Sequence, residues 1–152
     1  MSLTIDDRAI ASTLLLESGD RLYNMADLEE GRTQEILAAI KQIRQKISWK
    51  PDKAQIHLAK RIRLGHLSSQ ATLEDYQSLI RAILNNKEAK LYIFIYESII
   101  YPTVVANFEQ RLWLVMFGLT GILETAFPPN NPELYLANPA FLYLGFLKDW
   151  EQ

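Results

Sequence analysis

The stretch LYIFIYESIIYPTVVANFEQRLWLVMFGLTGILETAF, residues 91–127, decides the fold that this sequence predicts. It contains four short apolar runs, rich in β-branched and aromatic residues, and each run is closed by a turn signal. Such runs suit the pleated, half-buried surface of a sheet. We therefore expect strands at 91–96, 99–106, 112–117 and 121–127. Because the connections between them are only a few residues long, neighbouring strands should be antiparallel, and the predicted sheet is a four-stranded antiparallel meander.

A sheet this apolar needs a helical cover, and the preceding sequence supplies helical patterns. Isoleucines recur at helical spacing and predict a helix at about 33–48. Pro51 fits the first position of a second helix at 51–64, because its missing N–H costs nothing there. Gly65 is the residue type that commonly follows a helix end. The expected line of contact between this second helix and the sheet is Ala54, Leu58 and Ile62.

A third helix is expected at 73–85, because Thr72 and Asp75 have the spacing of a capping box. Pro102 lies inside the second predicted strand, and proline cannot donate to the ladder. It therefore predicts an edge position or a bulge there. The apolar tail 139–150 predicts a last helix that packs back on the sheet. The expected fold class is α+β.

The N-terminal residues carry weaker signals. Residues 4–7 resemble a capping box and predict a short helix that ends near Gly19, although the run 12–16 fits an edge strand equally well. Residues 20–31 read as an acidic connection. We expect one domain over 1–152, divided as follows: an acidic segment 1–31, helices 32–86, the sheet 90–127, and a C-terminal turn and helix 128–152.

The same periodicities predict which side chains form the core. Apolar residues on the inner face of each helix and on one face of each strand should be largely buried. The predicted core residues are Ile40, Ile43, Leu58, Ile62, Leu79, Ile83, Ile93, Val104, Val115 and Phe117.

The composition is that of an ordinary globular protein, with 22% charged and 49% hydrophobic residues over 152 positions. The absence of cysteine excludes disulfides, thiolate metal sites and a cysteine nucleophile. The first residues lack a basic region followed by an apolar core, so no signal peptide is expected. The longest uncharged apolar runs, 112–123 and 134–147, are too short to span a bilayer. We expect a cytoplasmic protein with no membrane association.

Charge is distributed unevenly along a chain whose net charge is −2. Residues 1–30 contain seven acidic side chains and two arginines, a net charge of −5, whereas residues 50–66 carry a net charge of +4. Both histidines of the chain lie in this basic segment. A local basic patch on an acidic protein suggests a polyanion-binding surface. One hypothesis is that residues 20–30 lie near the patch and compete for it; the alternative is a solvated loop on the far side.

Several motifs occur in a recognisable order along residues 50–130. They are Ile56-His57-x-x-Lys60-Arg61 on a helix, Gly65-His66, the Thr72-capped helix with Asp75-Tyr76, Trp113-Leu-Val on one strand, and Glu124-Thr125-Ala126-Phe127-Pro128 on the next. In this order the motifs resemble the barnase–EndoU–colicin–RelE-like nuclease superfamily, and most closely its phage-barnase-like branch from phages and mobile elements.

The resemblance implies a metal-independent endoribonuclease of the toxin type, which needs no cofactor and cleaves RNA by attack of the 2′-hydroxyl. By position, His57, Lys60 and Thr125 are the candidate catalytic residues. Histidine suits proton transfer near neutral pH, and lysine and hydroxyl groups stabilise charge on the phosphate. The implied partners are RNA and a protein inhibitor or mobile-element partner. The candidate phosphate-binding residues are Arg61, Arg63 and His66.

The chain departs from this pattern because both histidines precede the sheet. A second acid or base would have to be Glu124, Tyr92, Tyr96 or Tyr101. Each candidate also has an ordinary structural interpretation: His57 as a half-buried helix residue, the cations as a solvated helix face, and the aromatic residues as core. Two other functions stay open, a non-catalytic RNA- or protein-binding module and a structural or regulatory protein of a mobile element.

Overall fold

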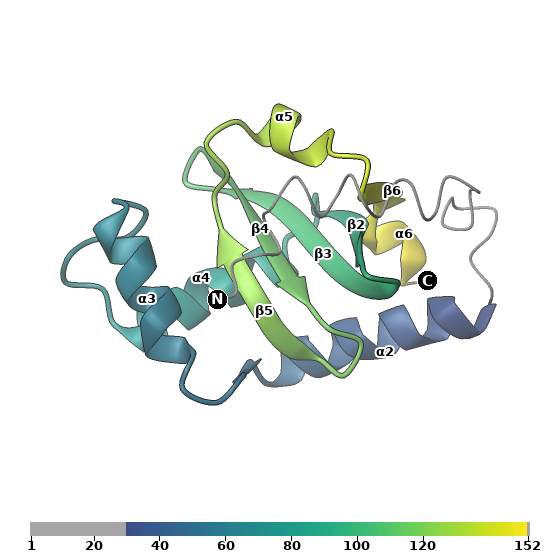
Figure 1. Ribbon diagram of the computed structural model, residues 1–152, viewed down its shortest axis with the longest axis horizontal. Coiled ribbons are helices and arrows are strands. Elements are labelled where there is room, and N and C mark those ends of the chain that lie inside the picture. The colour runs from purple at the N-terminus through teal and green to yellow at the C-terminus, as the bar shows by residue number, and fades with distance from the viewer. Residues whose placement is uncertain (1–29, 152) are drawn as a thin grey trace.

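The computed structural model describes residues 30–151 of the chain (Figure 1). The predictions for residues 1–29, namely the short helix, the alternative edge strand and the position of the acidic segment, lie outside the described residues.

A six-stranded mixed sheet forms the centre of the described structure, with the strand order β1-β5-β4-β3-β2-β6. All neighbouring strands are antiparallel except β1 and β5, which are parallel. The bounds are Ser48–Trp49 for β1, Lys90–Tyr96 for β2, Ile99–Phe108 for β3, Arg111–Phe117 for β4, Ile122–Phe127 for β5 and Phe141–Phe146 for β6.

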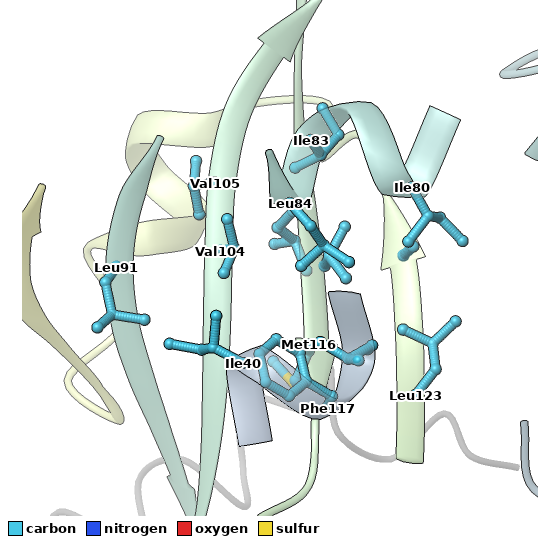
Figure 2. Close-up of a cluster of buried hydrophobic side chains, with 14 of the residues drawn as sticks. Ile40, Ile80, Ile83, Leu84, Leu91, Val104, Val105, Met116, Phe117 and Leu123 are labelled. Carbon is cyan, nitrogen blue, oxygen red and sulfur yellow. The ribbon is translucent and has the colours of Figure 1, made fainter. Parts of the chain in front are cut away.

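Two helices, α2 and α4, cover one face of this sheet. Ile80, Ile83 and Leu84 of α4 and Ile40 of α2 gather over Val104, Phe117 and Leu123 of the strands (Figure 2). The fold is therefore α+β, with its main core between this helix pair and the sheet. The helix bounds are Glu30–Gln45 for α2, Ala54–Arg63 for α3, Leu73–Leu84 for α4, Pro132–Leu136 for α5 and Leu147–Trp150 for α6.

The strand register assigns each side chain to a face. Leu91, Val104, Val115 and Ala126 are aligned across β2, β3, β4 and β5, and paired residues share a face. The Tyr76 hydroxyl of α4 donates to the Ala126 carbonyl at 2.6 Å, on what we call the helix-covered face. The alternating residues point to the opposite face, where the Tyr135 ring of α5 lies 5.5 Å from Phe127 and 5.6 Å from Phe141. The residues aligned on that face are Tyr92, Thr103, Met116 and Thr125.

Much of the predicted organisation is confirmed. The four predicted strands are present within a residue or two of their expected bounds. Thr72 caps α4 as predicted: its Oγ1 accepts from the Asp75 N–H at 3.1 Å, and Asp75 Oδ2 accepts from the Thr72 N–H at 2.9 Å. The predicted core residues are buried, except that Ile62 is half-buried.

The prediction of a four-stranded sheet followed by a C-terminal helix is wrong in detail. The apolar tail forms β6, which pairs with the free edge of β2, and only the single turn α6 follows. Gly145 has a φ of +105°, which a helix does not permit. The two-residue strand β1 at the other edge lies where the sequence predicted the end of a helix.

The second predicted helix starts later and packs differently from the prediction. Pro51 and Asp52 form a turn in which Asp52 has a φ of +62°, so α3 begins only at Ala54. The helix packs chiefly on α4, beyond the β5 side of the sheet (Figure 1), and buries Leu58 and Arg61. Of the predicted contact line, Leu58 is buried and Ala54 and Ile62 are half-buried, but the chief partner of the helix is α4 and not the sheet as predicted.

Pro102 does not lie in an edge strand, because β3 pairs with both β2 and β4. Its partner in β2 is Ile93, but the pairing of β3 with β4 begins only at Thr103. Pro102 thus lies past the last pair on the β4 side. A residue without an N–H can be accommodated there.

Candidate functional site

The C-terminal end of α3 positions the first part of the candidate site. Gly65, with a φ of +78°, reverses the chain after Leu64. The His66 N–H then donates to the Arg61 carbonyl at 2.8 Å, and the Gly65 N–H donates to the Ile62 carbonyl at 3.0 Å. This pair of hydrogen bonds is the Schellman arrangement, which a residue without a Cβ favours. It returns His66 to the side of the helix on which Arg61 lies.

Arg61 and His66 are joined by their side chains. The distance from Arg61 Nη1 to His66 Nδ1 is 3.1 Å, and a guanidinium only donates, so Nδ1 is the acceptor. The ring proton of neutral His66 is therefore on Nε2. Burial and the neighbouring cations, Arg61 first and then Arg111 and Lys60, lower the pKa of His66 to about 4. At neutral pH His66 is an uncharged hydrogen-bond donor.

The guanidinium of Arg61 lies in the interior. The residue is only 3% exposed, and its Cζ atom lies 5.4 Å from the centre of the Phe127 ring at the end of β5. A direct phosphate contact, as predicted for Arg61, needs an exposed cation. Arg61 instead holds His66 and contributes positive charge from beneath the surface.

His57 lies one turn before Arg61 on α3, and its ring is half-buried. The ring centre is 5.6 Å from that of Trp49, which in turn lies 5.6 Å from Tyr76. Burial lowers the pKa of His57 to about 4, with further contributions from Arg61, Lys60, Lys53 and Lys50. His57 is therefore neutral at pH 7, with the protonation state that a general base requires.

The cations around the two histidines form one group, which we call the basic cluster. Arg61 and Lys60 influence both rings, whereas Lys50 and Lys53 lie near His57 and Arg111 lies near His66. Within residues 30–151, no carboxylate forms an ion pair with Lys53, Lys60 or Arg111. The same holds for Arg63, which is exposed on α3. The basic cluster consists of Lys50, Lys53, His57, Lys60, Arg61, His66 and Arg111.

Lys50 connects the basic cluster to a carboxylate on β5. Its Nζ atom lies 2.6 Å from Glu124 Oε1, and the Glu124 side chain is only 9% exposed. Tyr101 lies near this carboxylate. Burial raises its pKa, and the charges of Glu124, Tyr96 and Glu97 raise it further. Of the four candidates for a second acid or base, Glu124, Tyr96 and Tyr101 therefore lie near one another.

Tyr92 lies elsewhere on the opposite face. Its ring is 5.0 Å from Tyr143 and 6.1 Å from Phe141, both on β6. Its pKa is raised by burial and by Tyr143. Tyr92 thus belongs to an aromatic group at the β6 edge.

Thr125 and the Trp49 ring, which contacts His57, lie on opposite faces of the sheet. It pairs with Met116, whereas Leu123 pairs with Phe117, the next residue of β4, so Thr125 and Leu123 point to opposite faces. Trp49 pairs with Leu123 and contacts His57. The structure therefore brings His57 and Lys60 together on α3, whereas Thr125 lies on the face of β5 that carries Phe127.

Two residues of the site had no signal in the sequence. Arg111 opens β4 and joins the basic cluster from a hairpin far away in the chain. Trp49 directly follows the helix predicted at about 33–48. In the structure it supports the His57 ring and donates through Nε1 to Gln77 Oε1 at 2.7 Å. A local pattern could reveal neither, because each residue meets a histidine only through the folded arrangement of separate segments.

The described residues include no cluster of three or more histidine, aspartate or glutamate side chains that could hold a metal ion. No helix within residues 30–151 has the length and apolar character needed to cross a bilayer. Comparisons of the chain with protein-family models, with curated proteins and with solved structures find no match.

Proposed function

We propose that this protein binds RNA through the basic cluster. The observation that carries the proposal is the convergence of cations from the segment after β1, from α3 and from β4. Of these, Lys53, Lys60 and Arg111 have no carboxylate partner within residues 30–151. Such cations gain most of their binding free energy by releasing the counterions of a phosphate backbone. The whole chain has a net charge of −2, so the attraction for RNA has to come from the basic cluster and not from the overall charge.

Two further features favour RNA as the polyanion. The Nε2–H of His66 is a neutral donor beside the cations, and hydrogen-bond donors of this kind contact phosphate oxygens without adding charge. The ordered motifs between residues 50 and 130 resemble a superfamily of ribonucleases. The opposite reading, that the cations are an ordinary solvated face, predicts no measurable affinity at physiological salt.

The test is the affinity for a short fluorescent single-stranded RNA, measured by anisotropy at low salt. Substitution of Lys60→Gln should weaken binding, because Lys60 lies near both histidines. Substitution of Lys41→Gln, at an exposed position of α2, removes the same charge and should leave the affinity unchanged. Equal affinities of the two variants would show that the basic cluster is not the binding surface.

A second candidate function is RNA cleavage by a metal-independent endoribonuclease of the toxin type. The specific observation in its favour is the neutral His57 one turn from Lys60, a base beside a fixed positive charge. A second acid or base would be Glu124 or Tyr101, which Lys50 connects to the basic cluster. A role of Thr125 in the same step stays a prediction, and so does a protein inhibitor.

Incubation with single-stranded RNA in EDTA tests the cleavage directly. We expect cleavage to require the 2′-hydroxyl, so that RNA is cut and DNA of the same sequence remains intact. Substitution of His57→Ala should abolish cleavage but retain RNA binding. Cleavage by this variant would exclude His57 as the base, and intact RNA with the native protein would leave a binding function alone.

A further inference from the structure

A pocket of about 470 Å³ opens beside the basic cluster, between α4, the loop after α3 and the end of β3. Its volume is in the range of about 300–1,000 Å³ that small-molecule sites occupy. Leu67, Ala71, Leu79 and Phe108 form apolar walls, and Phe108 is the aromatic one. Such walls suit a flat, weakly polar ring.

The rim of this pocket carries a few polar groups. Ser68 Oγ accepts from the Gln70 N–H at 3.0 Å, so its hydroxyl hydrogen remains available to a ligand. The side-chain amide of the exposed Gln70 makes no hydrogen bond within residues 30–151. An amide presents a donor and an acceptor side by side, as the edges of nucleobases do. The Phe108 ring suits the flat face of a nucleobase, and Ser68 and Gln70 suit its polar edge.

The pocket lies next to phosphate-binding groups as well. His66 directly precedes Leu67, and Arg111 is the cross-strand partner of Phe108, so Arg111 and Phe108 share a face of the sheet. Arg111 also lies close enough to His66 to lower its pKa. A ligand that combines a ring with a phosphate group would therefore find an apolar pocket and cationic groups on the same two segments.

We propose that this pocket binds an unstacked base of a single-stranded RNA whose phosphates contact the basic cluster at His66 and Arg111. The inference rests on the proposed RNA binding and adds a base subsite to it. A base in a duplex is paired and stacked and cannot enter, so the site selects single strands. Phe108 supplies the ring contact, and Gln70 reads the edge of the base.

The experiment compares two polyanions. Single-stranded RNA offers phosphates and bases, whereas inorganic polyphosphate offers phosphates alone. In the full chain, Phe108→Leu keeps the apolar packing but removes the ring, and we expect its RNA affinity to fall about fivefold or more, as loss of base–aromatic stacking requires. Gln70→Ala should reduce RNA affinity by a smaller factor. Neither change should alter the affinity for polyphosphate.

A matched control is Phe146→Leu, which makes the same change at a half-buried ring on β6 and should leave both affinities unchanged. Thermal unfolding checks each variant, and if Phe108→Leu fails to fold, the exposed Gln70→Ala variant decides. Unchanged RNA affinity in the folded variants, or an equal loss for RNA and polyphosphate, would overturn the base subsite while RNA binding stands. If the native protein binds neither polyanion, the proposed function itself fails.

Discussion

Buried positive charge is the unusual residue-scale feature of this protein. Arg61 lies beneath the surface, and its guanidinium helps to keep the two histidines of the chain neutral. A cation at such a depth is costly to desolvate. Contact with the Phe127 ring and with His66 Nδ1 offsets part of that cost. Arg61 thus keeps His66 neutral, with its ring proton on Nε2, from a buried position.

The histidines make stability depend on pH. Their pKa values are about 4 in the folded protein and near 6.5 in an unfolded chain. Between these values the unfolded state binds more protons, so their contribution is complete above about pH 6.5 and is lost as the pH falls towards 4. Urea unfolding at several pH values should show this loss. The double variant His57→Gln, His66→Gln should depend less steeply on pH over this window; an equal slope would contradict the assigned pKa values.

Two isoleucines allow a direct test of the core. Ile83 on α4 is 0% exposed, whereas Ile56 on α3 is 58% exposed. Replacing Ile83 by alanine should lower the free energy of unfolding by roughly 2–5 kcal/mol, because it leaves a cavity between α4 and the sheet. The same change at Ile56 should stay within about 0.5 kcal/mol. Similar losses at both positions, measured by chemical denaturation, would mean that the helix faces are assigned wrongly.

At the scale of elements, the strength of the local signal decided what the sequence could predict. The capped helix α4 and the strands β2 to β5 have many residues in one pattern, and their bounds were predicted closely. The two hairpins are closed by Glu97-Ser98 and Glu109-Gln110, which adopt positive φ without glycine or asparagine. These hairpins were predicted from the apolar, β-branched and aromatic runs and the short breaks between them, although the turn residues themselves are not the types that favour positive φ.

The predictions that failed concern features with a weak local pattern or with a position set by distant segments. The strand β1 is two residues long and has no period to detect. The run that forms β6 is apolar throughout, and periodicity alone cannot assign such a run to a helix or a strand. It becomes a strand because the edge of β2 is open for pairing, which the sequence does not show. Arg61 could not be recognised as buried, because its burial depends on where α3 meets α4 and Phe127. The sequence could place His57, Lys60 and His66 together, since they share one helix and its end.

Two glycines test the end of α3. Neither Gly31 nor Gly65 has any atom within 4 Å of an added Cβ, but only Gly65 has a positive φ. Gly65→Ala should therefore destabilise the protein by about 1 kcal/mol, through backbone strain alone. Gly31→Ala lies in α2 and should stabilise it by up to about 1 kcal/mol, since alanine favours helix. Changes of the same sign in thermal unfolding would contradict the assigned helix end.

At the scale of the whole molecule, the basic cluster combines side chains from three separate parts of the chain. Lys50 and Lys53 follow β1, Lys60 and His66 lie on and after α3, and Arg111 opens β4. The sheet holds these segments in register, so the surface exists only in the folded protein. The competition of acidic residues 20–30 for this surface stays a prediction, because most of that segment lies outside the described residues.

The salt dependence of RNA binding tests the central claim most directly. The variant Lys53→Gln, Lys60→Gln, Arg111→Gln removes three cations of the basic cluster, and Lys41→Gln, Lys87→Gln, Lys148→Gln removes three exposed cations elsewhere, so the two variants have the same net charge. Affinity falls as salt rises, so the plot of log affinity against log salt has a negative slope. We predict that only the first variant makes this slope shallower, by about 2 for a single-stranded RNA. The same slope in both variants and the native protein would contradict RNA binding through the basic cluster.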